Sequence, residues 1–545
     1  MRSRLLDLPP ELTICILCHL NLSSIISLAN AYPSIRPIIE DFVSSYYRSA
    51  TQEAIVDDNQ HCNLPTLDRL AILRSRENGW AKLGVDLKRS IPISYDPSNV
   101  QRLESGHFIV SEVYGRGFYS CKLPSKASDH TTWSHIKVEN FHDVALSIDE
   151  HDLAAAVTLP SDSAKRNQPC QIEVKLLQFS TGNPHPLADF PTVILGDSMP
   201  PSAIKIDICE DYIGIVCGNV DVIDSLFQDH VFIINWKTGM QRMHIVVSCG
   251  SYFDISFLSS ELILLPNTRS ATLDIWRIPG ISSAPPTRPL LILRLPRTAS
   301  FVLDPCIMLT HDVSRTATNS NRPFHTAPAD LLIGIKIIAS MFGPLIFVVV
   351  HRRALVALLP DNSESTAGVN VIEQHNDRDI ITHWDSTTHE SDIIRWSEWG
   401  PSITRCFSIR GFGQHMYHRT ITAGQRCLIG FPSGNASSEM ETPPTSFFIL
   451  DFNPSTVKLA LEPGATSYTA CTGPNGTVDV LCTCVLGSQL PFAFQRVNFG
   501  IKTIGWLFMD EDQIVAYGKL ATDARPMLEV FHMGAEADLR PAQLA

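Results

Sequence analysis

Two pairs of cysteines in this sequence have spacings that permit metal or redox chemistry. Cys15 and Cys18 form a Cys-x-x-Cys pair, and Cys482 and Cys484 alternate within an apolar run. Thiolates at such spacings bind zinc, and a Cys-x-x-Cys pair also takes part in disulfide exchange. A zinc ribbon needs a second pair at matching spacing, and the sequence has none. Because Cys15 and Cys18 lie among apolar residues at helical spacing, we interpret both pairs as packing residues.

Histidines gather in two further stretches. His415 and His418 flank two residues, but two imidazoles alone make a poor metal site. The second stretch, residues 383–392, holds a richer set of potential ligands: His383, Asp385, His389, Glu390 and Asp392. We interpret the first stretch as surface and the second as a solvated loop, with a metal site in the second as the alternative. The sequence therefore predicts no metal and no cofactor.

Motifs of nucleotide-binding and hydrolytic enzymes are missing from the sequence. It contains no Gly-x-Ser-x-Gly, no phosphate-binding loop ending in Lys-Ser/Thr and no dinucleotide fingerprint. Gly115 and Gly117 lack the third glycine of such a fingerprint. We therefore expect no catalytic residues and predict that the protein is not an enzyme.

Length and charge narrow the class of protein further. The chain has 545 residues, 44% of them hydrophobic, which requires either several domains or a repeat architecture. A formal net charge of −13 argues against nucleic acid as a partner, because binding the phosphate backbone needs a basic surface. Fourteen cysteines without a regular pattern, and a first segment interrupted by Asp7, Pro9 and Pro10, predict an intracellular protein with free thiols.

One apolar stretch, residues 331–350, has the length of a membrane span. Lys336 lies within it, and Gly343 and Pro344 interrupt its second half. Its many Val and Ile residues suit strands. We therefore favour two buried strands joined by a turn near residues 340–344, and no membrane contact. The basic residues at 351–353 leave a span as the alternative.

The first ninety residues have the spacing of helices. Leu12, Ile16 and Leu20 recur every four residues after a Pro pair that suits a first helical turn. Further helices are predicted around residues 25–29, from Pro33 to about residue 56, and over 64–83.

From about residue 91 onward, almost every apolar run is short, rich in Val, Ile and Phe, and bounded by turn residues. Roughly 450 residues of such strands are hard to close as one sandwich and easier to arrange as four-stranded blades around an axis. We predict a β-propeller of about seven blades. Polar segments at 160–170, 315–328, 361–390 and 432–446 are predicted loops between strands.

The N-terminal residues 8–35, LPPELTICILCHLNLSSIISLANAYPSI, resemble an F-box. The family pattern has a Leu-Pro pair, a Glu two positions on, and apolar residues at fixed spacing. It falls on Leu8, Pro9, Glu11, Leu12, Ile16, Leu17, Leu20, Leu22, Ile25 and Leu28. The end departs from the pattern, because Tyr32, Pro33, Ser34 and Ile35 replace the usual Cys, basic and aromatic residues.

The rest of the chain is similar to F-box proteins of mushroom-type fungi that carry a C-terminal propeller-like region. The similarity rests on a helical segment, LDRLAILRSRENGWAKL, and on strand motifs such as FIINWKTG at 232–239 and FMDEDQIVAYG at 508–518. The resemblance implies an F-box over 1–50, a helical linker over 51–90 and a β-propeller-like substrate-binding domain over 91–545. It also implies that the F-box residues bind a Skp-type adaptor of a cullin ubiquitin ligase.

Trp396 and Trp399 are the candidate residues for a substrate-binding face of the propeller. They lie three residues apart, so in a strand they would point to opposite sides and could not both be buried. The expected function is a substrate-recognition adaptor for an unknown protein substrate. The alternatives are an interaction scaffold outside a ligase and, less favoured, a hydrolase with carboxylates in the propeller channel.

Overall fold

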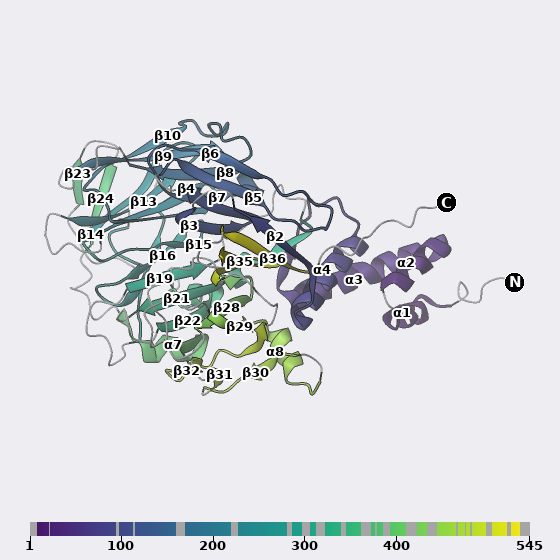
Figure 1. Ribbon diagram of the computed structural model, residues 1–545. Coiled ribbons are helices and arrows are strands. Elements are labelled where there is room, and N and C mark those ends of the chain that lie inside the picture. The colour runs from purple at the N-terminus through teal and green to yellow at the C-terminus, as the bar shows by residue number, and fades with distance from the viewer. Residues whose placement is uncertain are drawn as a thin grey trace.

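The computed structural model describes most of the chain, and Figure 1 shows the arrangement of its elements. The described residues are 8–20, 22–93, 97–112, 115–159, 169–219, 227–280, 286–296, 306–311, 322–338, 345–360, 372–375, 379–384, 393–409, 422–432, 444–464, 467–474, 476–479, 482–497, 504–519 and 525–534.

Seven sheets, each with a core of four antiparallel strands, form the blades of a β-propeller (Figure 1). The innermost strands of blades 2, 3 and 4 contact one another in turn, and that of blade 7 contacts that of blade 1, which closes the ring. The predicted mainly β architecture with about seven blades is therefore confirmed.

The first four blades follow the chain in order, each written here from its inner to its outer strand. Blade 1 is β3 (Pro97–Glu104), β4 (His107–Glu112), β5 (Gly117–Lys122) and β6 (Trp133–Lys137). Blade 2 is β7 (Phe141–Ser147), β8 (Leu153–Thr158), β9 (Cys170–Gln178) and β10 (Thr192–Ser198). Blade 3 is β11 (Ala203–Cys209), β12 (Tyr212–Gly218), β13 (Gln228–Asn235) and β14 (Gln241–Ser248). Blade 4 is β15 (Ser256–Ser259), β16 (Leu262–Asn267), β17 (Thr272–Arg277) and β18 (Leu291–Arg294).

The last three blades differ from the first four. Blades 5 and 6 contain inserted segments, and blade 7 includes a strand from the start of the propeller sequence. Blade 5 is β19 (Cys306–His311), β21 (Leu332–Ile338), β22 (Leu345–His351) and β26 (Thr404–Ile409). Blade 6 is β27 (Thr422–Ala423), β28 (Arg426–Pro432), β29 (Pro444–Asp451) and β33 (Phe492–Val497). Blade 7 is β34 (Ile504–Met509), β35 (Gln513–Lys519), β36 (Met527–Met533) and β2 (Val85–Pro92).

The middle strands of the blades are buried on both faces, because each blade is packed between two neighbours. This explains why their sequences are continuous apolar runs, such as LAAAVT in β8 and LIFVVVH in β22, instead of alternating patterns. β21 and β22 pair antiparallel, so the interpretation of residues 331–350 as two buried strands is confirmed. No helix among the described residues has both the length and the apolar character needed to cross a membrane.

The last blade joins the two ends of the propeller sequence. β2 pairs antiparallel with β36, from Val85 opposite Met533 to Pro92 opposite Met527. This pairing joins the first strand of the propeller to the last by backbone hydrogen bonds, so the two ends of the propeller sequence are held together in one blade. The predicted linker, residues 51–90, therefore includes most of a propeller strand.

Insertions before the fourth strands of blades 5 and 6 add further strands to the outer edges of blades 3, 4, 5 and 6. β24 (Asp379–Trp384) pairs parallel with β14 of blade 3, and β25 (Ile393–Ile394) pairs parallel with β18 of blade 4. The remaining added strands are β23 (Ile372–His375) on β24, β30 (Thr469–Cys471) on β33, and β32 (Cys482–Cys484) on β26 with β31 (Thr477–Asp479) beside it. Short helices α6 (Arg352–Val356), α7 (Trp396–Ile403) and α8 (Pro454–Ala460) connect them, while α5 (Ile148–His151) lies in blade 2.

The N-terminal helices project from one side of the propeller (Figure 1). They are α1 (Pro10–Cys18), α2 (Leu22–Ala31), the 3-10 turn η2 (Pro33–Ile35), α3 (Arg36–Ala54) and α4 (Thr66–Lys82). The helices predicted from the sequence are therefore confirmed. One short pairing was not predicted: β1 (Val56–Asp58) pairs with β20 (Phe324–Thr326), which lies in a predicted loop just before the turn η4 (Pro328–Asp330).

Candidate functional site: the exposed helical face and its attachment

The N-terminal helices have a core of their own. Leu17 of α1 and Ile25 of α2 are buried together with Ile39, Val43 and Tyr47 of α3. Leu70 and Leu73 of α4 belong to the same cluster, as does Phe324 of the propeller strand β20. These apolar contacts hold α1 and α2 against α3.

Helix α1 keeps much of its apolar surface exposed. Leu12 is 51% exposed, Ile14 39% and Ile16 36%, whereas Thr13 and Leu17 are buried. Leu12 and Ile16 are four residues apart and share one face of the helix, while Ile14 lies on the other side. Helix α1 is therefore apolar around most of its circumference but buried along only one stripe.

The ten predicted Skp-binding residues do not share one environment. Leu12, Ile16, Pro9 and Glu11 are exposed, and Leu8 is half-buried. Leu17 and Ile25 are buried in the core of the helical segment, and Leu20 and Leu28 are partly buried against it. The side chain of Leu22 lies outside the described residues. In the divergent segment, Pro33 and Ser34 are exposed and Ile35 is buried.

A strand pair forms the first attachment of the helices to the propeller. β1 and β20 align Val56 with Thr326, and Nδ2 of Asn59 donates a hydrogen bond of 2.8 Å to the carbonyl of Arg322. On the helical side, the hydroxyl of Tyr47 donates to Oδ1 of Asp58 at 2.8 Å. Burial and the neighbouring Asp58 carboxylate raise the pKa of Tyr47, so its hydroxyl keeps its proton.

Helix α4 forms the second attachment by packing between blades 6 and 7. Trp80 is buried in the core that these two blades share, and its Nε1 donates a hydrogen bond of 2.8 Å to the carbonyl of Glu511. The hydroxyl of Tyr468 donates to the carbonyl of Trp80 at 3.2 Å. Gly79 permits this close approach, because a Cβ there would lie 2.7 Å from the backbone nitrogen of Gly534.

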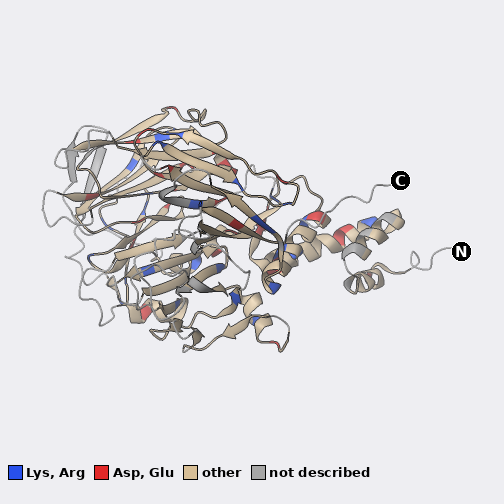
Figure 2. Ribbon diagram, viewed as in Figure 1, with Lys and Arg blue, Asp and Glu red and all other residues tan. Residues whose placement is uncertain are grey.

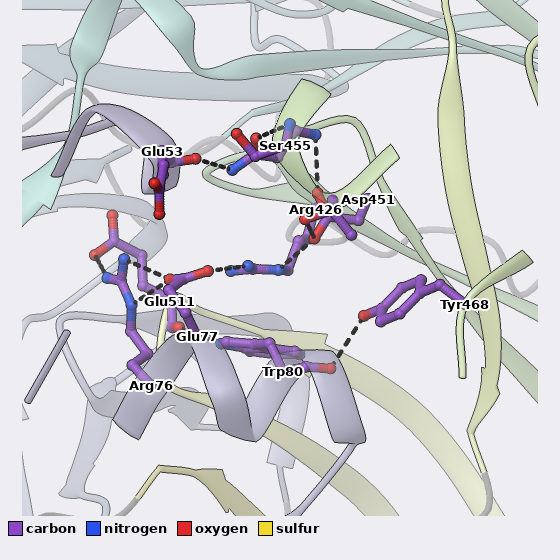
Figure 3. A network of polar contacts seen from close by, with 11 residues as sticks. Glu53, Arg76, Glu77, Trp80, Arg426, Asp451, Ser455, Tyr468 and Glu511 are labelled. Carbon is purple, nitrogen blue, oxygen red and sulfur yellow. Dashed lines mark hydrogen bonds and ion pairs between the residues drawn. The ribbon is translucent and has the colours of Figure 1, made fainter. Parts of the chain in front are cut away.

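A network of charged groups completes this attachment (Figure 3). Arg426 of β28 lies between Glu77 of α4 and Asp451 of β29, at 2.5 Å and 3.0 Å. Burial alone would raise the pKa of Glu77, but the guanidinium groups of Arg426 and Arg76 outweigh it and hold that pKa below its usual range. Burial raises the pKa of Asp451 despite Arg426. The helical segment is thus joined to the propeller by apolar, backbone and ionic contacts.

Helix α1 carries few charges. Figure 2 shows charged residues of both signs on α3 and α4 and scattered over the blades. Helix α1 has Glu11 as its only acidic residue in the first turn and no basic residue in its last turn. A partner that binds α1 would therefore meet a mainly apolar surface.

Trp396 and Trp399, the candidate residues for a substrate-binding face, do not lie in a strand. The segment forms helix α7, in which residues three apart share a face. Trp399 is 1% exposed and its Nε1 donates a hydrogen bond of 3.0 Å to the carbonyl of Arg294. Trp396 is partly buried against it, with ring centroids 4.9 Å apart. Trp399 is thus a packing residue between blades 4 and 5 and is not available as a substrate face.

The candidate metal ligands of the sequence do not form a site in the part of the chain that the structure describes. No group of three or more His, Cys, Asp and Glu residues there is placed to hold a metal ion. Cys15 is exposed, and Cys482 and Cys484 are buried. His415, His418, Asp385, His389, Glu390 and Asp392 lie outside the described residues, as does the side chain of His383.

Carboxylates at the inner strands connect one blade to the next. Oδ2 of Asp207 in blade 3 accepts a hydrogen bond of 3.0 Å from the backbone N–H of Phe257 in blade 4. Asp254 repeats this contact with the N–H of Leu309 in blade 5, at 2.9 Å. This role was not predicted from the sequence, although an Asp followed by Ile recurs, within β11 and just before β15. Both carboxylates accept hydrogen bonds from the backbone of the next blade. They therefore give no support to the alternative of a hydrolase with carboxylates in the propeller channel.

Comparisons with known proteins identify no family. No family model matches the chain, and a search of curated proteins finds no match. Among solved structures, BamB from Moraxella catarrhalis is similar with 11% identity and a TM-score of 0.32, covering 82% of this chain and 98% of that chain. The C-terminal WD40 domain of Sif2 has 10% identity and a TM-score of 0.30, covering 82% and 97%. At such values the description of the fold rests on the strand pairing alone.

The strand pairing defines the class of the protein by its fold: a seven-bladed β-propeller that carries an N-terminal helical segment with an exposed apolar face.

Proposed function

We propose that the chain is a substrate-recognition adaptor of a Skp-cullin-F-box ubiquitin ligase. In this role α1 and α2 bind a Skp-type adaptor protein, and the propeller binds a protein substrate. The proposal joins the F-box resemblance of residues 8–35 to one observation, the open apolar surface of α1.

The exposed apolar side chains of α1 favour binding to a partner protein, because their burial would lower the free energy of the complex. A helix that is apolar around most of its circumference is normally buried around most of it, yet Leu12, Ile14 and Ile16 are exposed to solvent. Burying each fully exposed side chain of this size in a complex contributes about 1.5–3 kcal/mol. Leu17 and Ile25 contribute instead to the internal core that holds α1 in place.

The attachment of the helices to the propeller fits the same role. An adaptor that carries no catalytic group acts by holding two proteins near each other, which raises their effective concentration. Trp80, Gly79 and the Arg426–Glu77 ion pair tie α4 to blades 6 and 7. A ligase bound at α1 would therefore hold the propeller in a defined orientation.

Binding of the full-length protein to a recombinant Skp-type adaptor tests the proposal. The interface variant carries Leu12→Glu and Ile16→Glu. The matched control carries Leu459→Glu and Leu461→Glu, which replace two apolar residues on α8 and beyond it that are 39% and 60% exposed. We expect binding by the wild type and the control, and a loss of at least about tenfold in affinity for the interface variant, since about 1.4 kcal/mol is tenfold.

Two results would contradict the proposal: no complex with the wild type, or equal binding by the interface variant. Co-purification of a cullin separates a ligase adaptor from a scaffold that uses α1 for another protein. Capture of a partner without cullin or a Skp-type protein would favour the scaffold.

A further inference from the structure

The insertion in blade 6 brings two cysteines together at the boundary between two blades. Cys471 ends β30, which pairs with β33 of blade 6. Cys484 ends β32, which pairs with β26 of blade 5. The two residues therefore belong to strands that extend different blades.

The two sulfur atoms lie beside the same glycine. A Cβ on Gly476 would overlap Sγ of Cys471 and lie 3.3 Å from Sγ of Cys484. The carbonyl of Gly476 accepts a hydrogen bond of 2.8 Å from the backbone N–H of Cys484. The two thiols also form a side-chain hydrogen bond with each other. Gly476 thus leaves room for both sulfurs in one place.

A buried cation faces this pair. Arg405 of β26 is fully buried, and it donates to the carbonyls of Leu490, Gly473 and Ser488 at 2.7, 2.8 and 3.0 Å. Its Nη2 is buried without a hydrogen-bond partner among the described residues. A buried guanidinium favours an anion nearby, and the thiols whose pKa it acts to lower are those of Cys471, Cys484 and its chain neighbour Cys406.

We propose that Cys471 and Cys484 form a dithiol site that hydrogen peroxide converts to a disulfide. The Cys471 thiolate attacks one peroxide oxygen; the O–O bond breaks, hydroxide leaves and takes up a proton, and a sulfenic acid forms on Cys471. The thiol of Cys484 then attacks that sulfur, which forms the S–S bond and releases water. In total two thiols lose two electrons and two protons, and one peroxide becomes two waters.

The electrostatics assign the two roles. The hydrogen bond from Cys484 lowers the pKa of Cys471 to about 6, burial opposes this, and Arg405 assists it. The same hydrogen bond raises the pKa of Cys484, which keeps its proton. Cys471 is half-buried and reachable, while Cys484 is buried. Cys471 is accordingly the attacking thiolate and Cys484 the resolving thiol.

The disulfide would change how the blades are joined. It would link β30 to β32 covalently, and so tie the outer edge of blade 6 to that of blade 5. This inference does not depend on the ligase role, because neither the thiols nor Arg405 touches the N-terminal helices in any described hydrogen bond or ion pair.

Peptide mapping of the full-length protein tests the site. The reduced protein is treated with an excess of hydrogen peroxide, the remaining thiols are alkylated, and the digest is analysed by mass spectrometry. We expect a linked peptide pair joining residues 471 and 484 in the wild type and in the control Cys15→Ser. The variant Cys484→Ala should instead accumulate the sulfenic acid on Cys471.

The pH dependence of alkylation provides a second readout. We expect the iodoacetamide rate at Cys471 to reach half its maximum near a pH of about 6 in the wild type, and near about 8.5, the usual value for a thiol, once Cys484→Ala removes the donor. The proposal is overturned if no 471–484 link forms under peroxide, or if the wild-type midpoint lies at the usual value. A pair that only packs would give both of these results.

Discussion

Arg426 of β28 and Glu77 of α4 lie 349 positions apart in the chain, yet Nη2 of Arg426 donates a hydrogen bond of 2.5 Å to Oε2 of Glu77. The same guanidinium lies over the ring of Trp80, 5.1 Å from its centroid. One side chain of the propeller therefore contacts both the charged and the aromatic residue by which α4 is attached.

Replacing this arginine should weaken the whole molecule. Arg426→Met leaves Asp451 buried without its cation and Glu77 with Arg76 alone. Breaking a buried ion pair in this way typically costs about 3–5 kcal/mol. We expect the urea midpoint of unfolding to fall accordingly. The double variant Arg426→Met, Glu77→Gln should recover part of the loss, because it removes one of the two carboxylates that Arg426 had neutralised. A single variant as stable as the wild type would mean that the ion pair does not hold α4 in place.

A buried lysine should give the stability a distinctive pH dependence. Lys336 of β21 is 1% exposed; burial lowers its pKa from 10.5 to about 7, and Asp254 only partly opposes this. Between pH 7 and pH 10.5, Lys336 is protonated in the unfolded chain but largely neutral in the folded one. The free energy of unfolding should therefore rise with pH across that range, by up to about 1.4 kcal/mol per pH unit.

Unfolding curves measured across the same pH range check this prediction. Lys336→Met should flatten the rise and stabilise the protein below pH 7, where the folded state otherwise holds a buried charge. The control Lys458→Met, on the exposed side of α8, should leave the profile unchanged. An unaltered profile in the Lys336 variant would show that another group causes it.

Truncation of two leucines of α1 to alanine should change the stability of the helical segment by very different amounts. Leu17 is in the core of the helical segment, so Leu17→Ala should destabilise that segment by about 2–5 kcal/mol. Leu12 is exposed, so Leu12→Ala should change stability by no more than about 0.5 kcal/mol. Hydrogen exchange of the α1–α3 amides measures both. Equal effects of the two substitutions would mean that α1 does not pack by the stripe described.

Deletions should show where the propeller begins. Removing residues 1–92 deletes Trp80 and strand β2, which exposes the edge of β36 and opens the core between blades 6 and 7. We expect this deletion to abolish cooperative unfolding, measured by circular dichroism on heating. Removing residues 1–20 takes away α1 only and should preserve the transition. A cooperative fold starting at residue 93 would refute the role of β2 in closing the ring.

The sequence by itself determined the kinds of elements and their order. Apolar spacing predicted the N-terminal helices, and short Val- and Ile-rich runs predicted the strands, including the pair within residues 331–350. These features depend on local periodicity, which reflects which faces of an element are buried. The same patterns predicted a propeller of about seven blades, because so many short strands need radial closure.

Only the tertiary structure decided which distant residues meet. Trp399 lies in helix α7 and its indole packs between blades 4 and 5, a position that the local sequence did not indicate. The pairing of β1 with β20, the contact of Arg426 with Glu77 and the meeting of Cys471 with Cys484 all join segments that no local pattern connects. Such contacts depend on the register of the strands and on the order of the blades around the axis. Neither can be predicted from the residues next to a side chain in the sequence.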